Sequence, residues 1–312
     1  MFKIFSQKIV FILLMLVLTL TFFPGSASTE KPVIAVTIVP QIEMLREIAG
    51  DKIEIVEMIP PGSSPANYAP SPAEMRAFNE AEIYFSIGVP ADIQNILPRA
   101  EDSDELKVVR LFEVVEDKFP HRYMDHSHEE DAHSHEEDAD DHQEEQGRDP
   151  HIWLSPERSA YIVEIMRDNL IELMPEHEKE FRKNAADYLA RLKEVDQKNA
   201  EVLSKYKDEK ILVYHPSYGY FTEHYGLDML AIEESGKEPG PRHISEIIDE
   251  ARKENIKTVF YQAEIDSNKT RAIAEELNGD IVQLNPLAED YLDNLAYIAD
   301  AFAEVLEKRV KQ

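Results

Sequence analysis

The sequence predicts an α/β protein in which two similar lobes, each built on a parallel sheet, are joined by one long rigid helix. Two observations support this fold class. Short apolar or β-branched runs alternate with helix-like segments on both sides of residues 176–206, as in parallel sheets covered by helices. Residues 176–206 contain neither glycine nor proline, so a single helix can run through them.

Residues 1–29 have the composition of a secretory signal peptide. Lys3 and Lys8 precede an apolar run from Ile9 to Phe23, and small residues follow Pro24, as at a cleavage site. The run has 15 residues, whereas a membrane-spanning helix needs roughly 20. We therefore expect a cleaved signal peptide, with an uncleaved anchor as the alternative.

The charge and the absence of cysteine narrow the class of protein. The chain carries 62 acidic and 33 basic residues, a formal net charge of −29, and no cysteine. Such a surface repels nucleic acid and attracts cations, so we expect no nucleic-acid partner. Without cysteine there is no disulfide, no thiolate metal site and no lipid-bearing cysteine after the signal. We expect a soluble monomer in a periplasm or another exported compartment.

Residues 30–175 are expected to form the first lobe. Four short runs there are apolar or β-branched, which is typical of strands buried in a parallel sheet. They are Val33–Val39, Ile53–Ile59, Ile83–Ile87 and Val108–Leu111. The segments between them predict helices bordered by proline or glycine. These are Gln41–Ile48, Pro72–Glu80 and Ala91–Ala100.

Residues 176–206 predict the helix between the lobes. Pro175 stands where a first helical turn accepts proline, and apolar side chains then recur at helical spacing. They are Phe181, Ala185, Leu189, Leu192, Val195, Val202 and Tyr206. A helix of this length spans roughly 45 Å at about 1.5 Å per residue. An ordinary amphipathic surface helix is the alternative, whereas a stiff rod would restrict ligand capture to small shifts and loop ordering.

Residues 207–312 repeat the alternation and predict the second lobe. The strand-like runs are Ile211–Tyr214, Leu227–Ile232, Thr258–Tyr261 and Ile281–Leu284. The helical segments are Ser217–Tyr225, Pro241–Glu254, Ser267–Asn278 and Asp290–Lys308. The repeated pattern is why two similar lobes are expected.

Residues 121–148 have no apolar periodicity and cannot bury a core. They hold eleven acidic residues and six histidines. The histidines are His121, His126, His128, His133, His135 and His142. Imidazoles and carboxylates are ligands of borderline divalent cations, so we interpret this segment as a metal-collecting loop. A solvated acidic linker is the alternative.

Polar residues at the expected strand ends are the candidate ligands of a fixed metal site, because ligands collect beyond the carboxyl ends of parallel strands. His215 directly follows the strand ending at Tyr214, and His151 enters from the His-rich loop. Because neutral imidazoles bind zinc, we expect His151 and His215 to meet in a cleft between the lobes. Other polar residues at strand ends are Ser63–Tyr68, Gln262, Glu264 and Asn285.

Two neighbours of His151 have alternative roles. Asp149 either accepts a hydrogen bond from an imidazole ring and fixes its tautomer or only begins the turn before Pro150. Trp153 is the only tryptophan and is expected in the core, where a position near His151 would let its fluorescence report on metal binding. The remaining histidines, expected at the surface, are His177, His224 and His243.

Five segments spread over the mature chain resemble the zinc and manganese solute-binding proteins of bacterial ABC uptake systems. They are PPGSSPANYAPSPAEM (60–75), DPHIWLSPE (149–157), VYHPSYGYF (213–221), GKEPGPRHISEI (236–247) and QLNPL (283–287). The His-rich loop is typical of the zinc-specific members. The resemblance implies two pseudo-symmetric lobes joined by one long helix. It also implies a divalent cation held between the lobes by three histidines and a carboxylate.

Carried over by position, the resemblance assigns His151 and His215 as the second and third histidine ligands. At the first histidine position the chain has Ala66, whose methyl group cannot coordinate, and at the carboxylate position it has Asn285, a weaker neutral ligand. Zinc prefers about four ligands. Glu264, a loop histidine or water is expected to complete the shell.

The resemblance implies an exported protein that captures a divalent metal, Zn²⁺ before Mn²⁺, and delivers it to an ABC permease. We do not expect an enzyme, because no nucleophile–base pair or phosphate loop is evident in the sequence. The alternative is a metal buffer or sensor that uses the His-rich loop while the cleft site is degenerate. A metalloenzyme with an open water position would need a third firm ligand and a general base.

Overall fold

The computed structural model describes residues 31–101, 103, 105–124, 147–233, 239–263 and 267–311. The expected signal peptide, Glu264 and residues 125–146 of the His-rich loop lie outside this part of the chain. Residues 32–312 belong to one unit that contains both lobes.

The first lobe is built on a four-stranded parallel sheet. Its strands are β1 (Val33–Val36), β2 (Glu54–Glu57), β3 (Ile83–Ser86) and β4 (Lys107–Arg110). They pair in the order β2-β1-β3-β4. β3 is buried along its whole length, and β1 is buried at all but its first residue. Strands covered on both faces are continuous apolar runs, which is why the sequence revealed them.

The second lobe repeats this topology. Its strands are β5 (Lys210–Val213), β6 (Asp228–Ala231), β7 (Val259–Tyr261) and β8 (Ile281–Gln283). They are again parallel and pair in the order β6-β5-β7-β8. The predicted fold class of two similar parallel-sheet α/β lobes is thus confirmed. In each sheet the strand order reverses between the first and third strands, the point at which open sheets bind ligands.

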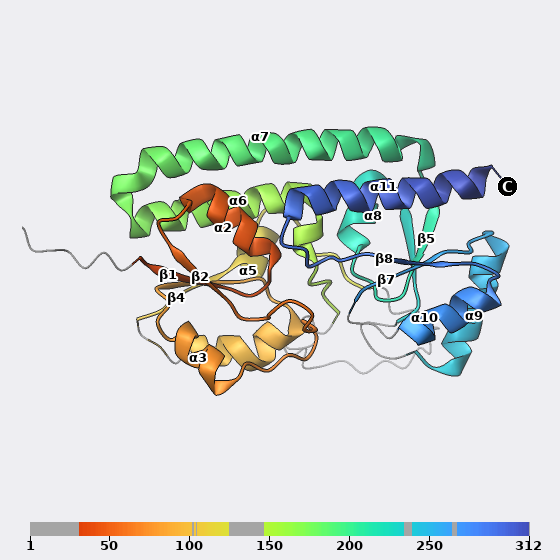
Figure 1. Ribbon diagram of the computed structural model, residues 1–312, viewed down its shortest axis with the longest axis horizontal. Helices are drawn as coiled ribbons and strands as arrows, with labels where there is room; N and C mark the ends of the chain where they lie inside the picture. The colour runs from red at the N-terminus through yellow and green to blue at the C-terminus, as the bar shows by residue number, and fades with distance from the viewer. Residues whose placement is uncertain are drawn as a thin grey trace, which may run out of the picture. The chain divides into compact units, whose positions relative to one another are not determined.

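Helices cover both sheets (Figure 1). In the first lobe they are α2 (Pro40–Ala49), α3 (Pro72–Phe78), the π-helical turn η1 (Asp92–Ile96), α4 (Leu97–Ala100) and α5 (Leu111–Glu116). In the second lobe they are α8 (Gly219–Tyr225), α9 (Pro241–Lys253), α10 (Ser267–Glu276) and α11 (Tyr291–Val310). Local sequence sets several of their starts. At α3, for example, Ser71 and Glu74 form a reciprocal capping box.

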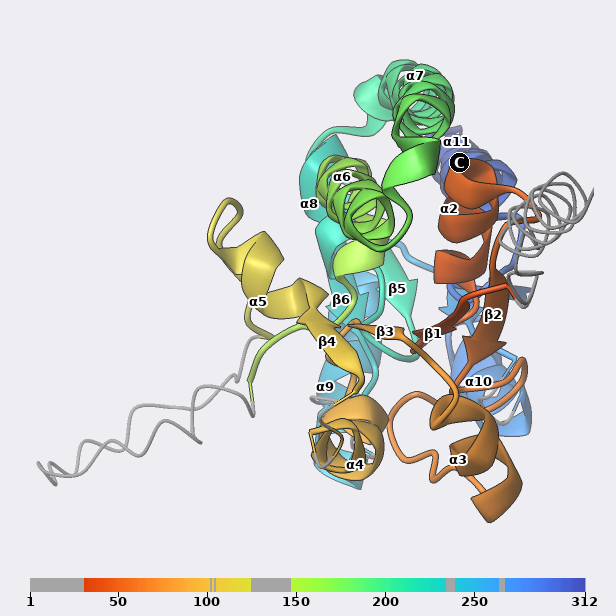
Figure 2. The ribbon, with the colours of Figure 1, turned by 90° about the vertical axis from the view of Figure 1, so that its left-hand side faces the viewer.

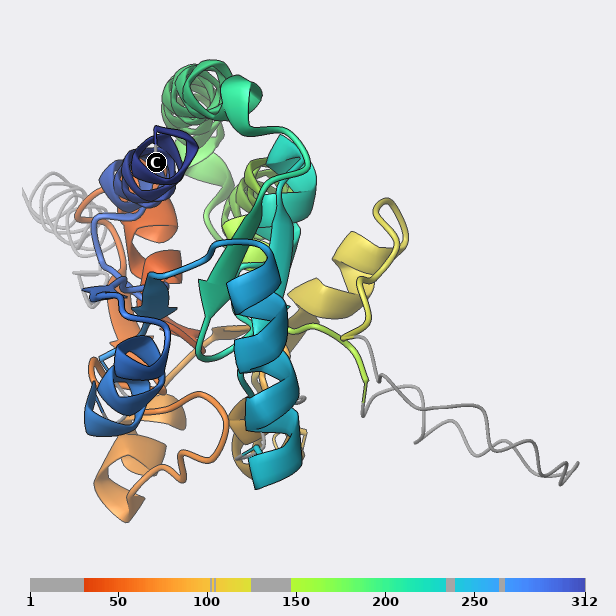
Figure 3. The same ribbon diagram turned by 90° about the vertical axis from the view of Figure 1, so that its right-hand side faces the viewer.

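The long connecting helix is α7 (Glu178–Leu203), with 3-10 turns at Pro175–His177 and Ser204–Tyr206. Figures 2 and 3 show it lying over α6 and beside α2 and α11, and it packs against all three. Asn184 Nδ2 donates to the carbonyl of Ile48 at 3.0 Å in the first lobe. Asn199 Nδ2 donates to the carbonyl of Leu295 at 3.1 Å in the second. The helix is therefore bonded to both lobes.

α6 (Pro156–Leu173) is absent from the helices predicted above. Its start has a clear signal, because Ser155 Oγ accepts a hydrogen bond from Arg158 N and proline occupies the first turn. Its buried face recurs at helical spacing, through Ser159, Ile162, Val163, Met166 and Leu170. The helix could therefore have been predicted from its cap and its periodicity.

The core is continuous between the lobes. Trp153, in the 3-10 turn η2 (Ile152–Leu154), is 1% exposed. Its indole Nε1 donates to the carbonyl of Pro286, in the segment after β8, at 2.8 Å. Tyr291 Oη in turn donates to the carbonyl of Trp153 at 2.6 Å.

In the described part of the chain, no helix is both long and apolar enough to span a bilayer.

Candidate metal site

His151 is held by Asp149 in two ways. Asp149 Oδ1 accepts a hydrogen bond from His151 N at 3.0 Å and lies 2.7 Å from His151 Nδ1. A carboxylate only accepts, so Nδ1 carries the proton and Nε2 is left with the lone pair that a cation can use. The imidazole is 10% exposed, and its burial, opposed by Asp149, lowers the pKa of His151 below the ordinary 6.5. The ring is therefore kept neutral, the form that binds metal.

His215 has a matching arrangement in the second lobe. It lies two residues after the end of β5, and Glu233, two residues after the end of β6, places Oε2 2.6 Å from His215 Nδ1. The backbone N–H of Glu233 donates to the carbonyl of Tyr214 at 2.8 Å, which fixes the backbone of Glu233 beside the residue that precedes His215. The side chains of His215 and Glu233 are 19% and 13% exposed. Here too the carboxylate orients the ring so that Nε2 is the free nitrogen.

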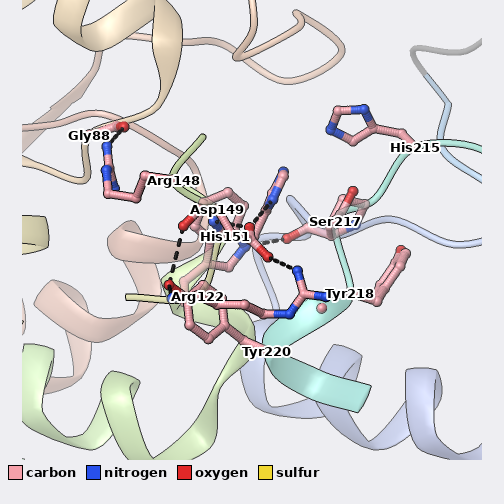
Figure 4. Close-up of polar contacts among 12 residues, drawn as sticks. Gly88, Arg122, Arg148, Asp149, His151, His215, Ser217, Tyr218 and Tyr220 are labelled. Carbon is pink, nitrogen blue, oxygen red and sulfur yellow. Dashed lines mark hydrogen bonds and ion pairs between the residues drawn. The ribbon is translucent and has the colours of Figure 1, made fainter. Parts of the chain in front are cut away.

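The two rings come together from separate lobes. Their centroids are 5.3 Å apart and their planes are inclined by 77°. Two imidazoles bound through one nitrogen each, at about 2.0 Å from one tetrahedral zinc ion, would hold their ring centres about 5 Å apart. The ring of Trp153 lies 5.2 Å from that of His151. Figure 4 shows both histidines, with the dashed polar contacts on the side of Asp149 and His151.

A family model described as "Zinc-uptake complex component A periplasmic" matches residues 34–305, which include both lobes and both histidines. The chain belongs to this family. The predicted relationship to solute-binding proteins of metal uptake systems is thereby confirmed. The family description is of a periplasmic component, which agrees with the expected exported location at that level of detail.

Individual relatives agree with this assignment. The chain is 26% identical over 285 residues to the zinc-binding lipoprotein AdcA of Streptococcus pneumoniae, covering 89% of this chain and 54% of that protein. It therefore spans about half the length of such streptococcal relatives. It is 24% identical over 301 residues to a putative metal-binding protein of Chlamydia trachomatis, covering 96% of this chain and 100% of the other.

Solved structures share the architecture. A crystal structure of ZnuA aligns with a TM-score of 0.77 at 27% identity, covering 89% of this chain and 100% of that chain. The periplasmic zinc binding protein TroA of Treponema pallidum aligns with a TM-score of 0.74 at 16% identity, covering 88% and 99%. The second likeness concerns the fold alone.

The two positions at which the chain departs from the family pattern are both exposed in the structure. Ala66 lies in a turn between β2 and α3, and its N–H approaches Ser64 Oγ at 3.3 Å. The side chain of Asn285 closes its own turn, since Oδ1 accepts a hydrogen bond from Leu287 N at 2.9 Å. That contact uses one of the two lone pairs of Oδ1 and holds the amide in this turn.

The other candidates do not complete a site within the described residues. Gln262 is buried after β7 and donates through Nε2 to Ser217 Oγ, so it supports the segment that follows His215. Glu264 lies outside the described residues. Among the residues that are described, no group of three or more His, Asp or Glu side chains is arranged to hold a cation. The described site is a pair of imidazoles with two supporting carboxylates.

His121 differs from the expectation of an open loop residue. Its ring is only 6% exposed, and Nε2 lies 3.2 Å from Glu116 Oε2. Burial, together with the positive charge of Arg148, lowers the pKa of His121. The described ends of the predicted loop are paired with each other, because Tyr123 and Arg148 form an antiparallel bridge. His126, His128, His133, His135 and His142 lie outside the described residues, and their metal-collecting role stays a prediction.

A buried carboxylate in the first lobe, that of Asp92, holds the turn that contacts Arg148. Asp92 accepts hydrogen bonds from Tyr84 Oη and Ser86 Oγ, both at 2.6 Å, and from Gly88 N at 2.9 Å. Burial raises the pKa of Asp92, and these donors oppose the rise. The carbonyl of Gly88 then accepts a hydrogen bond from the Arg148 guanidinium. The turn after β3 thereby fixes the residue that precedes Asp149.

Sequence reasoning missed two residues that hold the site. Glu233 directly follows the predicted strand 227–232, so the rule that identified His215 would have identified it as well. Arg122, which contacts Asp149, has no comparable signal, because residues 125–146 separate the two along the chain. Only the folded chain brings them together.

Proposed function

We propose that this protein captures a divalent transition metal ion, zinc, between His151 and His215 and delivers it to an ABC permease from an exported compartment. The observation that carries the proposal is the paired geometry. The ring centroids of two imidazoles from different lobes are 5.3 Å apart, and the Nδ1 of each ring contacts a carboxylate of its own lobe. Each ring is thus preset to offer Nε2 to a shared ion.

Zinc is favoured over manganese by the donor set. Imidazole nitrogen suits zinc, whereas manganese prefers carboxylate, carbonyl and water oxygens. The relatives agree, since AdcA is named as zinc-binding and a ZnuA deletion mutant of 27% identity, with a TM-score of 0.76, carries bound zinc. Covering 88% of this chain and 98% of that one, the ZnuA comparison includes both lobes.

Two protein ligands leave about two positions on the ion for other donors. Water, a histidine from residues 125–146, Glu264 or a rearranged Asn285 would fill them. A shell that is incomplete in protein ligands favours release, which suits a carrier. Delivery needs binding without chemistry, so we assign no catalytic role to either histidine.

The surrounding features fit an exported carrier. We propose that residues 1–29 are removed as a signal peptide, that the mature protein is a monomer and that α7 holds the lobes in place. The two α/β lobes would then present adjoining surfaces to the permease.

Zinc titration of the mature chain tests the proposal. Because Trp153 is the only tryptophan and its ring lies 5.2 Å from that of His151, its fluorescence reports on this site rather than on the His-rich segment. We expect His151→Ala and His215→Ala each to weaken the zinc affinity measured by this fluorescence change. Each loss of affinity should exceed the roughly 10–100-fold caused by removing an outer hydrogen-bond partner.

A shortened variant separates the carrier from the buffer. Met124 N donates to the carbonyl of Gly147 at 2.9 Å, so a two-residue Asn-Gly turn can replace residues 125–146 without straining the pair. We expect this variant to retain one zinc ion by calorimetry and to lose it in His151→Ala. If the shortened chain binds no zinc, the buffer alternative holds and the carrier proposal is wrong.

A further inference from the structure

We propose that Arg122 is a positioning residue for the metal site, which joins the base of the His-rich segment both to His151 and to α8 of the second lobe. This inference rests on the proposed function, because it concerns how firmly His151 is presented to the ion. Its support comes from three sets of contacts that meet at this one residue.

The first set is a short two-stranded stem. Met124 N donates to the carbonyl of Gly147 at 2.9 Å, Tyr123 pairs with Arg148, and Asp149 N donates to the carbonyl of Arg122 at 2.8 Å. The stem thus begins at Arg122 on one strand and ends at Asp149 on the other. His151 is two residues beyond it.

The second set fixes the Asp149 carboxylate. Arg122 Nη1 lies 3.0 Å from Asp149 Oδ2, while Oδ1 of the same carboxylate holds His151. Asp149 is fully buried and the Arg122 side chain is 24% exposed. Figure 4 shows the guanidinium directed at this carboxylate. With both oxygens engaged, the carboxylate cannot rotate without breaking a charge-assisted hydrogen bond, and the direction of the His151 ring is set with it.

The third set reaches the second lobe through α8. Arg122 N donates to Tyr220 Oη at 2.9 Å, and Tyr220 Oη donates to the carbonyl of Asp149 at 3.3 Å. Arg122 Nε also lies 3.7 Å from Glu223 Oε2. Both strands of the stem are therefore bonded to the helix that starts four residues after His215.

Gly219 shows how closely these groups approach α8. A Cβ at this position would lie 2.4 Å from Arg122 Nη1 and 2.7 Å from Asp149 Oδ2. The ion pair occupies the space that any other residue's side chain would need. Gly219→Ala therefore displaces the pair without removing either charge.

The distinction to be tested is between positioning and ordinary structural support. Replacing a residue that only stabilises the fold would lower the melting temperature of the metal-free chain and leave the zinc affinity of the folded protein unchanged. Replacing a positioning residue weakens zinc binding and shortens the lifetime of the bound state, since an outer partner of a metal ligand is worth roughly 10–100-fold in affinity.

The experiment measures zinc binding to the full mature chain through Trp153 fluorescence, at equilibrium and by stopped flow, beside the melting temperature without metal. Arg122→Gln is the principal variant and Gly219→Ala the second. Arg182→Gln is the matched control, because Arg182 pairs with Glu178 at 2.9 Å on the exposed face of α7. We expect Arg122→Gln to weaken binding about tenfold or more, mainly through faster dissociation, and Arg182→Gln to leave it within twofold.

Coupling to Asp149 provides the sharper criterion. In an Asp149→Asn background, Arg122→Gln should have little further effect on affinity, because the two residues act through one contact. Additive effects, or an Arg122→Gln affinity within twofold of the unsubstituted protein, would overturn the proposal. If Arg122→Gln does not fold, Arg122→Lys replaces it, with an intermediate loss expected and an unchanged affinity counting against the proposal.

The outcome also separates this inference from the proposed function. If His151→Ala leaves the zinc affinity intact, the proposed function fails and Arg122 has no site to position. If His151→Ala abolishes binding but Arg122→Gln does not alter it, only the inference about Arg122 fails.

Discussion

The two halves of the metal site differ in how firmly each histidine is held. In the first lobe, His151 is buried and its carboxylate partner Asp149 is fully buried, with one oxygen on the ring and the other on Arg122. In the second lobe, His215 and Glu233 are 19% and 13% exposed. The chemistry is the same in both halves, a carboxylate on Nδ1, but the first is supported on more sides.

This difference in burial indicates that His151 and His215 have different roles in binding the ion. A buried, charge-paired carboxylate is costly to displace, so His151 provides the fixed reference for the ion. The side chains of His215 and Glu233 are both more exposed to solvent than those of His151 and Asp149. We therefore expect His215 to be the ligand that adjusts when the ion binds or leaves.

Neutralising the two carboxylates gives the largest effect and tests the comparison directly. Asp149→Asn and Glu233→Gln each keep the shape of the side chain and remove its charge. We expect Asp149→Asn to weaken zinc binding by roughly 10–100-fold. Glu233→Gln should weaken it by only about threefold, because water can reach and replace a partly exposed partner.

The measurement is the zinc titration followed by Trp153 fluorescence in the full mature chain. Metal-free melting temperatures serve as the control for folding. Equal losses in the two variants, or a larger loss for Glu233→Gln, would break the comparison and make the second lobe the better-held half.

Much of this architecture was readable from the sequence because local patterns encode it. The near-continuous apolar runs of buried parallel strands identified both sheets, and the strand-end rule identified His215. The same rule also indicates Glu233, which directly follows the strand-like run Leu227–Ile232. The cap at Ser155 and the spacing of the apolar residues after it would similarly have predicted α6.

What the sequence does not encode locally is the support of His151. Arg122 and Asp149 are 27 residues apart, with the His-rich segment between them. Their pairing depends on the stem, on Tyr220 and on the absence of a side chain at Gly219. The burial of His121 against Glu116 is not predicted either, because composition alone places this residue in the His-rich loop.

A smaller effect is expected in the pH dependence of the metal-free fold. The folded-state pKa of His151, and that of His121, is lowered by burial from the ordinary 6.5. The unfolded chain therefore takes up protons at these positions before the folded chain does. The stability that they contribute is present above about pH 6.5 and is lost as the pH falls through the lower folded pKa, by at most about 1.4 kcal/mol per pH unit for each group.

Urea unfolding of the metal-free chain at several pH values between 7.5 and 5 checks this sign, with a chelator present throughout. His151→Gln should flatten the loss of unfolding free energy on acidification, and Arg182→Gln should retain the slope of the unsubstituted protein. A slope that His151→Gln leaves unaltered would show that the ring is not held neutral by the fold, and the first half-site would then lose its claim to be preset.

The smallest expected effect comes from adding a histidine to the first lobe at Ala66. This residue is exposed in its turn, as is its neighbour Asn67, so both accept a larger side chain. A third imidazole within reach of the ion would take a position now left to water, and we expect Ala66→His to tighten zinc binding a few-fold, at most about tenfold or 1.4 kcal/mol.

Asn67→His is the matched control, because it adds the same ring one residue away. Tightening by both variants would indicate surface binding without a specific position. Tightening by Ala66→His alone would show that the first lobe still faces the ion from this turn, and its half-site would then supply two of the three imidazoles. An unchanged affinity would mean that the shell is completed from elsewhere, and the adjustable side around His215 would become the place to look for the missing donor.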